Sequence, residues 1–218
     1  MKLPDFHKAF EYENNFYWTS PPSRLGKCVA HYELFKMANR VAGDIVECGV
    51  FKGASLLRFA SFQDLFGARR RSVIGFDTFG AFPETKFAPD RRHRRRFIRD
   101  AGASSISRQN LLAVAKRKGI ATPLQLIAGN AVRTVPAYVA AHPNLRIALL
   151  NLDTDTYEPA VAALQYLYPK IVKGGVFITD DYGVFPGETK AVDDFFRGTR
   201  VRIRSFPHVP TPHFIVKE

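Results

Sequence analysis

The sequence predicts a doubly wound α/β fold, in which helices cover both faces of a mostly parallel sheet. Short apolar runs alternate along the chain with segments of helical periodicity, which is typical of parallel strands joined by crossover helices. The chain has 218 residues, of which 46% are hydrophobic, so it can bury one substantial core. It contains no internal repeat and no low-complexity linker, so we expect a single domain over residues 1–218.

Five short apolar runs are the expected parallel strands. They are residues 44–50, 72–79, 124–130, 145–153 and 174–182. Each has the length and composition of a strand in a buried sheet. Two further β-rich runs near the C-terminus, residues 201–206 and 213–218, are expected to close the sheet as an antiparallel hairpin.

Helices are expected between the strands and before the first one. They are residues 27–41, 54–66, 110–119, 158–172 and 188–198. The fourth begins with Glu158 and Pro159, because proline is tolerated in a first helical turn and an acid suits the helix dipole. The first belongs to an N-terminal helical extension, residues 1–42, which we expect to pack on the core or at a subunit contact.

Residues 80–122 interrupt this alternation, because no strand pattern occurs between the second and third strands. A long insertion in a compact α/β domain is often a lid or a substrate cover, which is the role we expect. For residues 87–99 alone, a partly disordered surface insertion is an equally good interpretation.

The net charge is +12, and much of the excess lies in the runs that begin at Arg69 and Asp90. A solvated face, a site for an anionic small molecule and a nucleic-acid footprint are the competing interpretations. We favour the solvated face, followed by the anionic small molecule. Nucleic acid ranks last because the arginine run, residues 91–99, is not interleaved with aromatic residues at a stacking spacing.

The remaining composition predicts a soluble, cytoplasmic protein. Cys28 and Cys48 are too few for a disulfide framework and form no Cys-x-x-Cys pair. No apolar run reaches the roughly 18 residues that span a bilayer, and no secretory signal is recognisable. We therefore expect no membrane partner.

The strand ends carry the groups expected to bind a ligand, because ligands of open parallel sheets bind beyond the carboxyl ends of the strands. The first strand runs into "ECGVFKG", which contains Glu47, Gly49 and Gly53. The glycines permit a tight turn and close approach of a ligand, and the following helix N-terminus favours an anionic group. The second strand ends at Asp77, where an acid can accept hydrogen bonds from ribose hydroxyls.

Two strands end in paired acids. Asp153 and Asp155 follow the fourth strand, and Asp180 and Asp181 follow the fifth. If these strands are neighbours, four carboxylates meet and a cation should lie among them. Mg²⁺ prefers such oxygen ligands, and three of them could hold the ion while the fourth accepts a proton. The alternative is that one or two of the acids cap helices or face solvent.

No Ser-His-Asp or Cys-His arrangement is recognisable. The histidines are His7, His31, His93, His142, His208 and His213. We expect them away from the strand ends, as surface or core residues.

Five blocks resemble, in order, those of the macrocin O-methyltransferase (TylF-like) family over about residues 41–197. They are "DIVECGVFKGAS", "GFDTFGAFPE", "LLNLDTDTYEP", "KGGVFITDDYG" and "PGETKAVDDFF". The resemblance implies the Rossmann-like fold of class I S-adenosylmethionine-dependent methyltransferases, with seven strands and an antiparallel closure. It also implies Mg²⁺-dependent methylation of a hydroxyl on a sugar or related polyhydroxylated small molecule.

The resemblance further implies residue roles. Asp153, Asp180 and Asp181 would hold Mg²⁺, and Asp155 would be the general base. The implied cofactor-binding residues are Glu47, Gly49, Gly53, Ser55, Asp77, Gly129 and Asn130. The last two lie in "AGNAVRTVP", near the expected adenine, although this block lacks the family's aromatic residue after the glycine.

The basic segment after "FPET" is where we expect acceptor identity to be decided. A basic cover would suit a phosphate-bearing acceptor such as a nucleotide-linked sugar. The alternative function is that of a methyltransferase-fold protein that binds or modifies nucleic acid through its basic surface. A homo-oligomer is compatible with the sequence.

Overall fold

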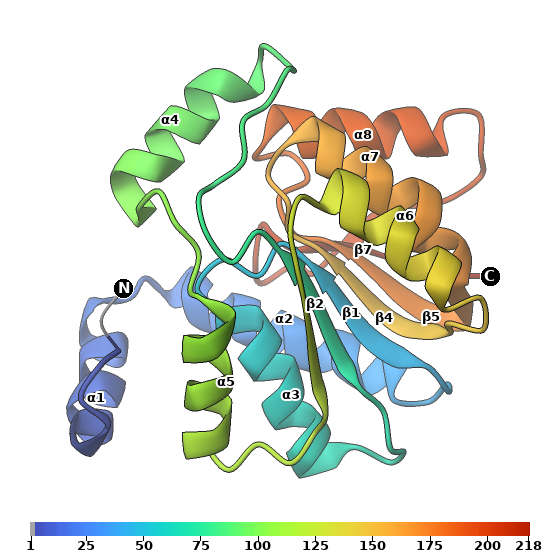
Figure 1. The fold of residues 1–218 in the computed structure, drawn as a ribbon. Helices are drawn as coiled ribbons and strands as arrows, with labels where there is room; N and C mark the ends of the chain where they lie inside the picture. The colour runs from blue at the N-terminus through green and yellow to red at the C-terminus, as the bar shows by residue number, and fades with distance from the viewer. Residues whose placement is uncertain (1–2) are drawn as a thin grey trace.

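The computed structural model describes residues 3–218 and contains a seven-stranded sheet of order β3-β2-β1-β4-β5-β7-β6 (Figure 1). The strands are β1 (Asp44–Cys48), β2 (Val73–Asp77), β3 (Leu124–Ala128), β4 (Ile147–Leu152), β5 (Ile171–Thr179), β6 (Arg204–Ser205) and β7 (His213–Val216). β1 to β5 are parallel, whereas β7 runs antiparallel to both β5 and β6. The predicted fold class, with its antiparallel C-terminal closure, is confirmed.

The strand order reverses between β1 and β4. β2 and β3 lie on one side of this point, and β4 and β5 lie on the other. Every residue of β4 is buried, because helices cover both faces of the strand. Crevices for ligands form at such a reversal, beyond the carboxyl ends of the strands.

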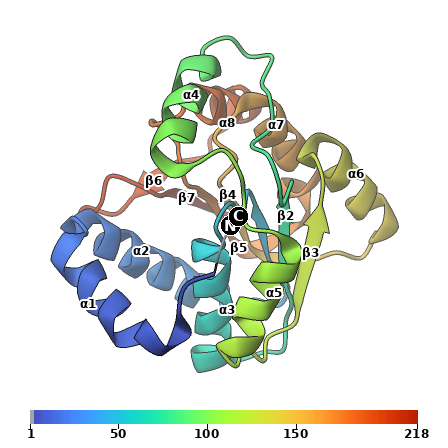
Figure 2. The ribbon, with the colours of Figure 1, turned by 60° about the vertical axis from the view of Figure 1, so that its left-hand side comes forward.

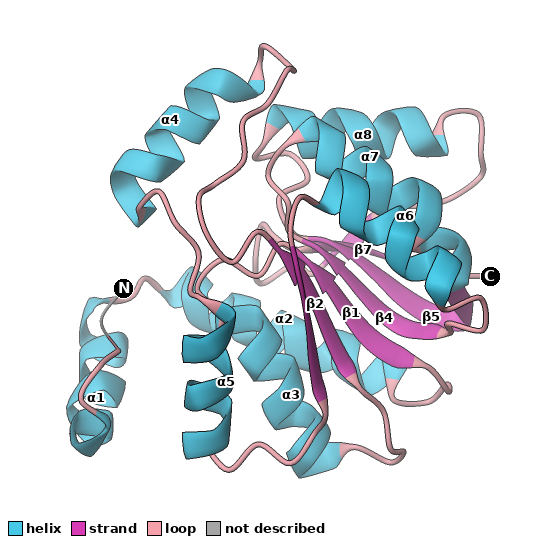
Figure 3. Cartoon of the chain, viewed as in Figure 1, coloured by secondary structure: helices cyan, strands magenta, loops and turns pink. Residues whose placement is uncertain are grey.

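Helices cover the sheet on both faces (Figures 1 and 3). The α-helices of residues 3–218 are α1 (Ala9–Thr19), α2 (Pro22–Ala38), α3 (Ala54–Phe66), α4 (Asp90–Ala101), α5 (Arg108–Arg117), α6 (Ala131–Ala141), α7 (Tyr157–Tyr166) and α8 (Pro186–Phe196), of which α1 and α4 do not cover the sheet. Phe35 and Phe59 belong to the core under α2, α3 and α5, and Leu164 and Phe177 to the core under α6, α7 and α8. Among the helices of residues 3–218, none is long and apolar enough to cross a membrane.

The insertion after β2 is ordered and contains α4 and α5. A disordered insertion was left open for residues 87–99, but most of this segment belongs to the helix α4. It stands off the sheet, and its first turn lies beside α7 and α8 (Figures 1 and 2). Ser105 N donates to Gly80 O at 2.8 Å. The two ends of the segment formed by residues 81–104 therefore lie next to each other.

Two carboxylates tether this insertion to the helices α7 and α8. Asp90, which is buried, accepts hydrogen bonds from Tyr157 N at 3.0 Å and from Gly187 N at 2.7 Å. It therefore caps the first turns of α7 and α8. In the opposite direction, Glu158 of α7 accepts from Lys86 N at 2.7 Å and from Phe87 N at 3.0 Å.

Besides α4, three further parts of the helix prediction differ from the structure. The helix expected over residues 158–172 ends at Tyr166, and β5 begins at Ile171, because Pro169 interrupts the helix and β-branched residues follow it. Helix α6 was not predicted, and it forms although Pro136 lies in its interior. The N-terminal helix begins at Pro22 rather than near residue 27, and α1 precedes it.

Candidate active site

Three carboxylates meet at the carboxyl ends of β4 and β5. The two strands pair in parallel with Leu152 opposite Thr179, so the turns that follow them lie side by side. Oxygen atoms of Asp153, Asp155 and Asp181 all lie within 4.8 Å of one another. We call these three residues the acidic triad.

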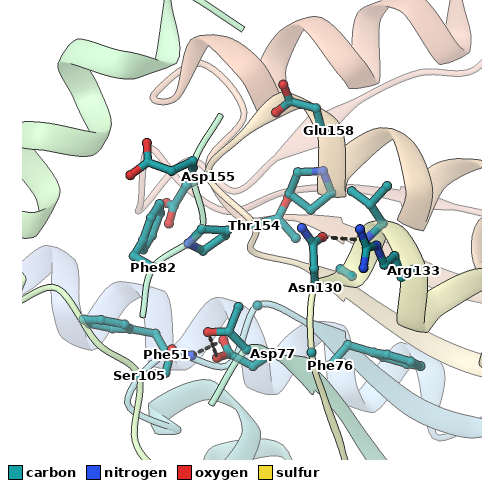
Figure 4. Close-up of a pocket in the computed structure, with 18 of the residues that line it drawn as sticks. Phe51, Phe76, Asp77, Phe82, Ser105, Asn130, Arg133, Thr154, Asp155 and Glu158 are labelled. Atoms are coloured by element: carbon teal, nitrogen blue, oxygen red, sulfur yellow. Dashed lines mark hydrogen bonds between the residues drawn. The ribbon is translucent and has the colours of Figure 1, made fainter. Parts of the chain in front are cut away.

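Asp155 lies in a strained turn. Its φ is +61°, in the left-handed region that residues other than glycine seldom adopt. Thr156 N donates to Thr154 O at 2.6 Å and closes the turn. The Asp155 side chain contributes to the wall of a cavity (Figure 4). Backbone strain at a residue that presents an acid to a cavity is typical of functional sites.

Burial and mutual repulsion raise the pKa of each carboxyl in the acidic triad. For Asp153 and Asp155, burial has the largest effect and the charges of neighbouring aspartates add to it. Burial is also the largest cause for Asp181. A divalent cation would relieve this repulsion, and carboxylate oxygens are the ligands that Mg²⁺ prefers.

Asp180, which the sequence grouped with these acids, makes different contacts. Its Oδ2 accepts a hydrogen bond from the Lys27 ammonium, and its Oδ1 lies 3.3 Å from Nε2 of His31. Burial alone would raise the pKa of Asp180, but His31 and Lys27 outweigh it and hold that pKa at about 2. The expectation that the histidines lie away from the strand ends was therefore wrong for His31.

Glu188 of α8 joins the two acidic turns. Its Oε2 accepts from Thr154 N at 3.1 Å, while its Oε1 accepts from Asp181 N at 3.1 Å and from Thr179 Oγ1 at 2.8 Å. Glu188 is fully buried, and burial followed by the charge of Asp181 raises its pKa to about 8. One side chain thus fixes the exits of both strands.

Gly49 brings the turn after β1 against the acidic turn. Its φ is +93°, and a Cβ at this position would lie 1.8 Å from Asp153 O. Only glycine allows this approach. Gly53 has a φ of +83° before α3, and a Cβ there would lie 2.6 Å from Leu111 Cδ1 of α5.

Glu47 is fully buried at the end of β1. Its Oε1 accepts a hydrogen bond from Ser55 Oγ, whereas its Oε2 is buried without a partner within residues 3–218. Burial raises the pKa of Glu47 to about 8. A cationic or hydrogen-bond-donating ligand group would satisfy the unpaired oxygen.

Asp77 at the end of β2 organises the turn after β1. Its Oδ2 accepts hydrogen bonds from Val50 N and Phe51 N, each at 2.9 Å, and its Oδ1 accepts from Phe79 N at 2.7 Å. Phe51 has a φ of +49°, so these hydrogen bonds to Asp77 hold a backbone conformation that is unfavourable by itself. Asp77 thereby links the ends of two neighbouring strands.

A cavity of about 360 Å³ lies between these strand ends (Figure 4). Of the residues that the sequence singled out, its wall includes Gly49, Asp77, Gly129, Asn130, Asp153 and Asp155. The others, which lie outside this wall, are Glu47, Gly53, Ser55, Asp180 and Asp181. Asn130 also caps α6, where its side chain accepts from Val132 N at 2.9 Å.

Three residues of the site were not predicted from the sequence. Lys27 and His31 carried a usable signal, since they lie four residues apart in a predicted helix and therefore share one face. Nothing near Glu188 in the sequence indicates that its side chain links the turns after β4 and β5, which are far apart in the sequence.

Comparison with known proteins gives relatives and structural neighbours. The chain is 29% identical over 165 residues to demethyldecarbamoylnovobiocin O-methyltransferase of Streptomyces niveus, which covers 73% of the chain and 60% of the relative. It is 30% identical over 162 residues to the 8-demethyl-8-(2,3-dimethoxy-alpha-L-rhamnosyl)-tetracenomycin-C 4'-O-methyltransferase of Streptomyces olivaceus. This match covers 68% of the chain and 56% of the relative. The chain thus spans less than two thirds of the length of these curated relatives.

Among solved structures, CalS11, described as a calicheamicin methyltransferase, superposes with a TM-score of 0.75 at 24% identity, covering 99% of this chain and 86% of that one. The O-methyltransferase NovP superposes with a TM-score of 0.74 at 23% identity, and the match covers 87% of this chain and 78% of NovP. These likenesses establish the fold. Residues 24–204 match the family described as Macrocin-O-methyltransferase (TylF), and the chain belongs to that family.

Proposed function

We propose that this protein transfers a methyl group from S-adenosylmethionine to a hydroxyl of a sugar or glycoside, with the help of a divalent cation such as Mg²⁺. The observation that carries the proposal is the acidic triad beside a cavity of about 360 Å³ in a chain of this family. The names of the relatives describe O-methyltransferases of novobiocin, tetracenomycin and mycinamicin compounds, which supports a glycosylated acceptor.

The residues around the cavity fit S-adenosylmethionine, which supplies the methyl group. Glu47 lies outside the cavity wall, at the end of β1, and its unpaired Oε2 suits an ammonium group such as that of a methionine moiety. Asp77 lines the cavity and is our candidate for accepting hydrogen bonds from the ribose hydroxyls. Gly129 and Asn130, which follow β3, also line the cavity, and we propose that the adenine lies against them.

The acidic triad fits a divalent cation. We assign Asp153 and Asp181 as its ligands, since Mg²⁺ commonly binds through one or two carboxylates and keeps other oxygen ligands. Such an ion, when bound, lowers the pKa of an acceptor hydroxyl. The family resemblance adds Asp180 to this set, but Lys27 and His31 engage both of its oxygens.

Asp155 is our candidate for the general base. It faces the cavity, and burial raises its pKa, which makes it a stronger proton acceptor than an ordinary aspartate. Glu188 fixes the turn that carries it through Thr154 N. The insertion supplies Phe82 and Pro83 to the cavity wall, so it would also exclude water from the reacting groups.

A phosphate-bearing acceptor, such as a nucleotide-linked sugar, is supported by the charge of α4. Arg91, Arg92 and Arg95 are exposed on this helix and form no ion pair with any residue from 3 to 218. Arginine binds phosphate oxygens well because its planar guanidinium donates several hydrogen bonds.

Two measurements test the proposal. S-adenosylhomocysteine should raise the unfolding temperature, because a ligand that binds only the folded state stabilises it. In a methyl-transfer screen over nucleotide sugars and glycosides, EDTA should abolish turnover and Mg²⁺ should restore it. Asp155→Asn should lower kcat by about 100-fold or more while leaving the S-adenosylhomocysteine shift intact. The absence of a thermal shift would argue strongly against binding of a methyl donor. Full activity in EDTA would show that the reaction needs no divalent cation.

Nucleic-acid binding is the second candidate, supported by the net charge of +12. Binding to random RNA that collapses between low and physiological salt would reflect only phosphate contacts. Retained affinity for one RNA sequence would favour this candidate over the small-molecule acceptor.

A further inference from the structure

We infer that Asp180 is a positioning residue and not a ligand of the divalent cation: Lys27 and His31 of α2 hold it as a charge-compensated anion behind the acidic triad. The inference rests on the proposed function, because it concerns the ligand set of the proposed cation. It departs from the family resemblance, which counts Asp180 among the ligands.

The first argument is the direction of neighbouring side chains. Successive side chains of a strand point to opposite faces of the sheet. In β5, Ile178 belongs to the core under α2 and α3, and Phe177 to the core under α6, α7 and α8. Asp180 N donates to Leu152 O at 2.8 Å, so the extended pairing continues past the strand. By this alternation, Asp180 faces α2, and Asp181 faces the other side.

The second argument is that a cation of the protein already compensates Asp180. The ammonium of Lys27 binds Oδ2, and the side chain of Asp180 is only 1% exposed. A carboxylate buried this deeply needs a partner of opposite charge. With Lys27 in place, this pair is neutral, whereas no ion pair within residues 3–218 engages a carboxylate of the acidic triad.

The third argument is the orientation of His31. Nη1 of Arg58 lies 3.0 Å from Nδ1 of His31, and a guanidinium can only donate, so Nδ1 accepts. The proton of the neutral ring is therefore on Nε2, where it points to Oδ1 of Asp180. The His31 ring is fully buried and stacks on Phe59 with centroids 4.9 Å apart. These contacts fix the ring independently of any ion.

Helix geometry explains why α2 can supply both partners. Lys27 and His31 are four residues apart, so they lie one above the other on a single face of the helix. That face meets the end of β5. The N-terminal extension thus positions the turn that carries Asp181. It does so through Asp180, which is not itself a ligand of the cation.

Calorimetric titration with Mn²⁺ tests the inference without an activity assay. Asp181→Asn should weaken Mn²⁺ binding by about tenfold or more, since it removes a ligand. Asp180→Asn alone should also weaken it, because the unpaired Lys27 charge then repels the ion. The double variant Lys27→Gln/Asp180→Asn removes both charges and should bind Mn²⁺ within about threefold of the wild type.

The matched control is Lys36→Gln/Glu33→Gln, which neutralises a surface ion pair of 2.9 Å on the same helix. If the double variant binds Mn²⁺ as weakly as Asp181→Asn, Asp180 is a direct ligand and the inference fails alone. If the wild type itself does not bind Mn²⁺, both the inference and the proposed cation fail. Should the double variant not fold, Lys27→Met/Asp180→Leu carries the same test, because apolar replacements of a buried ion pair are often tolerated.

Discussion

At Gly49 a single hydrogen atom occupies the space in which any other residue carries a Cβ. Gly49→Ala would place that Cβ 1.8 Å from Asp153 O, so the turn after β1 or the acidic turn must move. We expect the free energy of unfolding to fall by about 2 kcal/mol or more, as urea denaturation would measure it.

The control for this substitution is Gly119→Ala. Gly119 also has a positive φ, of +70°, but nothing lies within 4 Å of the position of its Cβ. It therefore reports backbone strain alone, which costs roughly 1 kcal/mol. Equal losses in the two variants would show that the contact with Asp153 has no energetic weight.

Glu47 should make stability depend on pH. Its pKa is about 8 in the folded state, against 4.5 for an ordinary glutamate. As the pH rises from 4.5 to 8, the unfolded state loses this proton first, so the folded state becomes less stable over that window. Glu47→Gln has no proton to lose there. Its free energy of unfolding should therefore rise relative to the wild type between pH 5 and pH 8, by an amount on the order of 2–4 kcal/mol.

Chemical denaturation of both proteins at the two pH values measures this difference. Glu13→Gln, an exposed acid of α1, serves as the control and should follow the wild type. A difference between wild type and Glu47→Gln that is constant with pH would contradict the buried, protonated glutamate.

At the scale of elements, the tether at Asp90 determines how firmly the insertion is held. Asp90→Ala removes the acceptor for Tyr157 N, which is partly buried, and for Gly187 N, which is buried. We expect a loss of about 1–3 kcal/mol in the free energy of unfolding and faster amide hydrogen exchange over residues 86–101.

Asp100→Ala is the matched control, because Asp100 is an exposed acid at the other end of α4. It should leave exchange over residues 86–101 close to that of the wild type. Unchanged exchange in Asp90→Ala would mean that the aromatic contacts of Phe97 with Phe51 and Phe82, rather than the tether, hold the helix.

Elements whose pattern is local could be predicted, and those that depend on distant partners could not. The five parallel strands and α3 follow from apolar runs and spacing. Helix α4 has only Phe97 and Ile98 as large apolar residues in a run of arginines, and the aromatic partners of Phe97 come from elsewhere in the chain. Helix α6 contains Pro136, which breaks the expected pattern although tertiary packing keeps the helix.

The same distinction holds for the site. Asp153, Asp155 and Asp181 were grouped correctly in space, because the ends of neighbouring parallel strands meet at one edge of a sheet. The separation of Asp180 from them depends on which helix covers the end of β5. That pairing joins α2 to the end of β5 across 153 residues of the chain, and no local pattern encodes it.

At the scale of the whole molecule, α1 is a helix without a buried residue. Its exposed aromatic residues are Phe10, Tyr12, Phe16, Tyr17 and Trp18. At 150–250 Å² per aromatic side chain, they leave roughly 600 Å² of surface uncovered. With Leu25 and Val29 of α2, this approaches the roughly 800 Å² per partner of a stable interface, and a helix of this length is marginal alone.

We therefore expect a second copy of the chain to cover α1. Size-exclusion chromatography with light scattering should give a dimer or a higher oligomer, and Phe10→Ser/Trp18→Ser should shift it to the monomer. Leu65→Ser/Leu112→Ser, which alters exposed leucines of α3 and α5, should leave the assembly unchanged. A monomeric wild type would contradict this expectation.

The bond from Ser105 N to Gly80 O has a consequence for how relatives of this protein diversify. Because both ends of the intervening segment are pinned at one place, a replacement of different length costs little extra chain entropy. The acids and their anchors on α2 and α8 belong to other parts of the chain. A chimera that receives this segment from another member, with an aspartate kept where Asp90 stands, should inherit the donor's choice of acceptor and retain the recipient's chemistry.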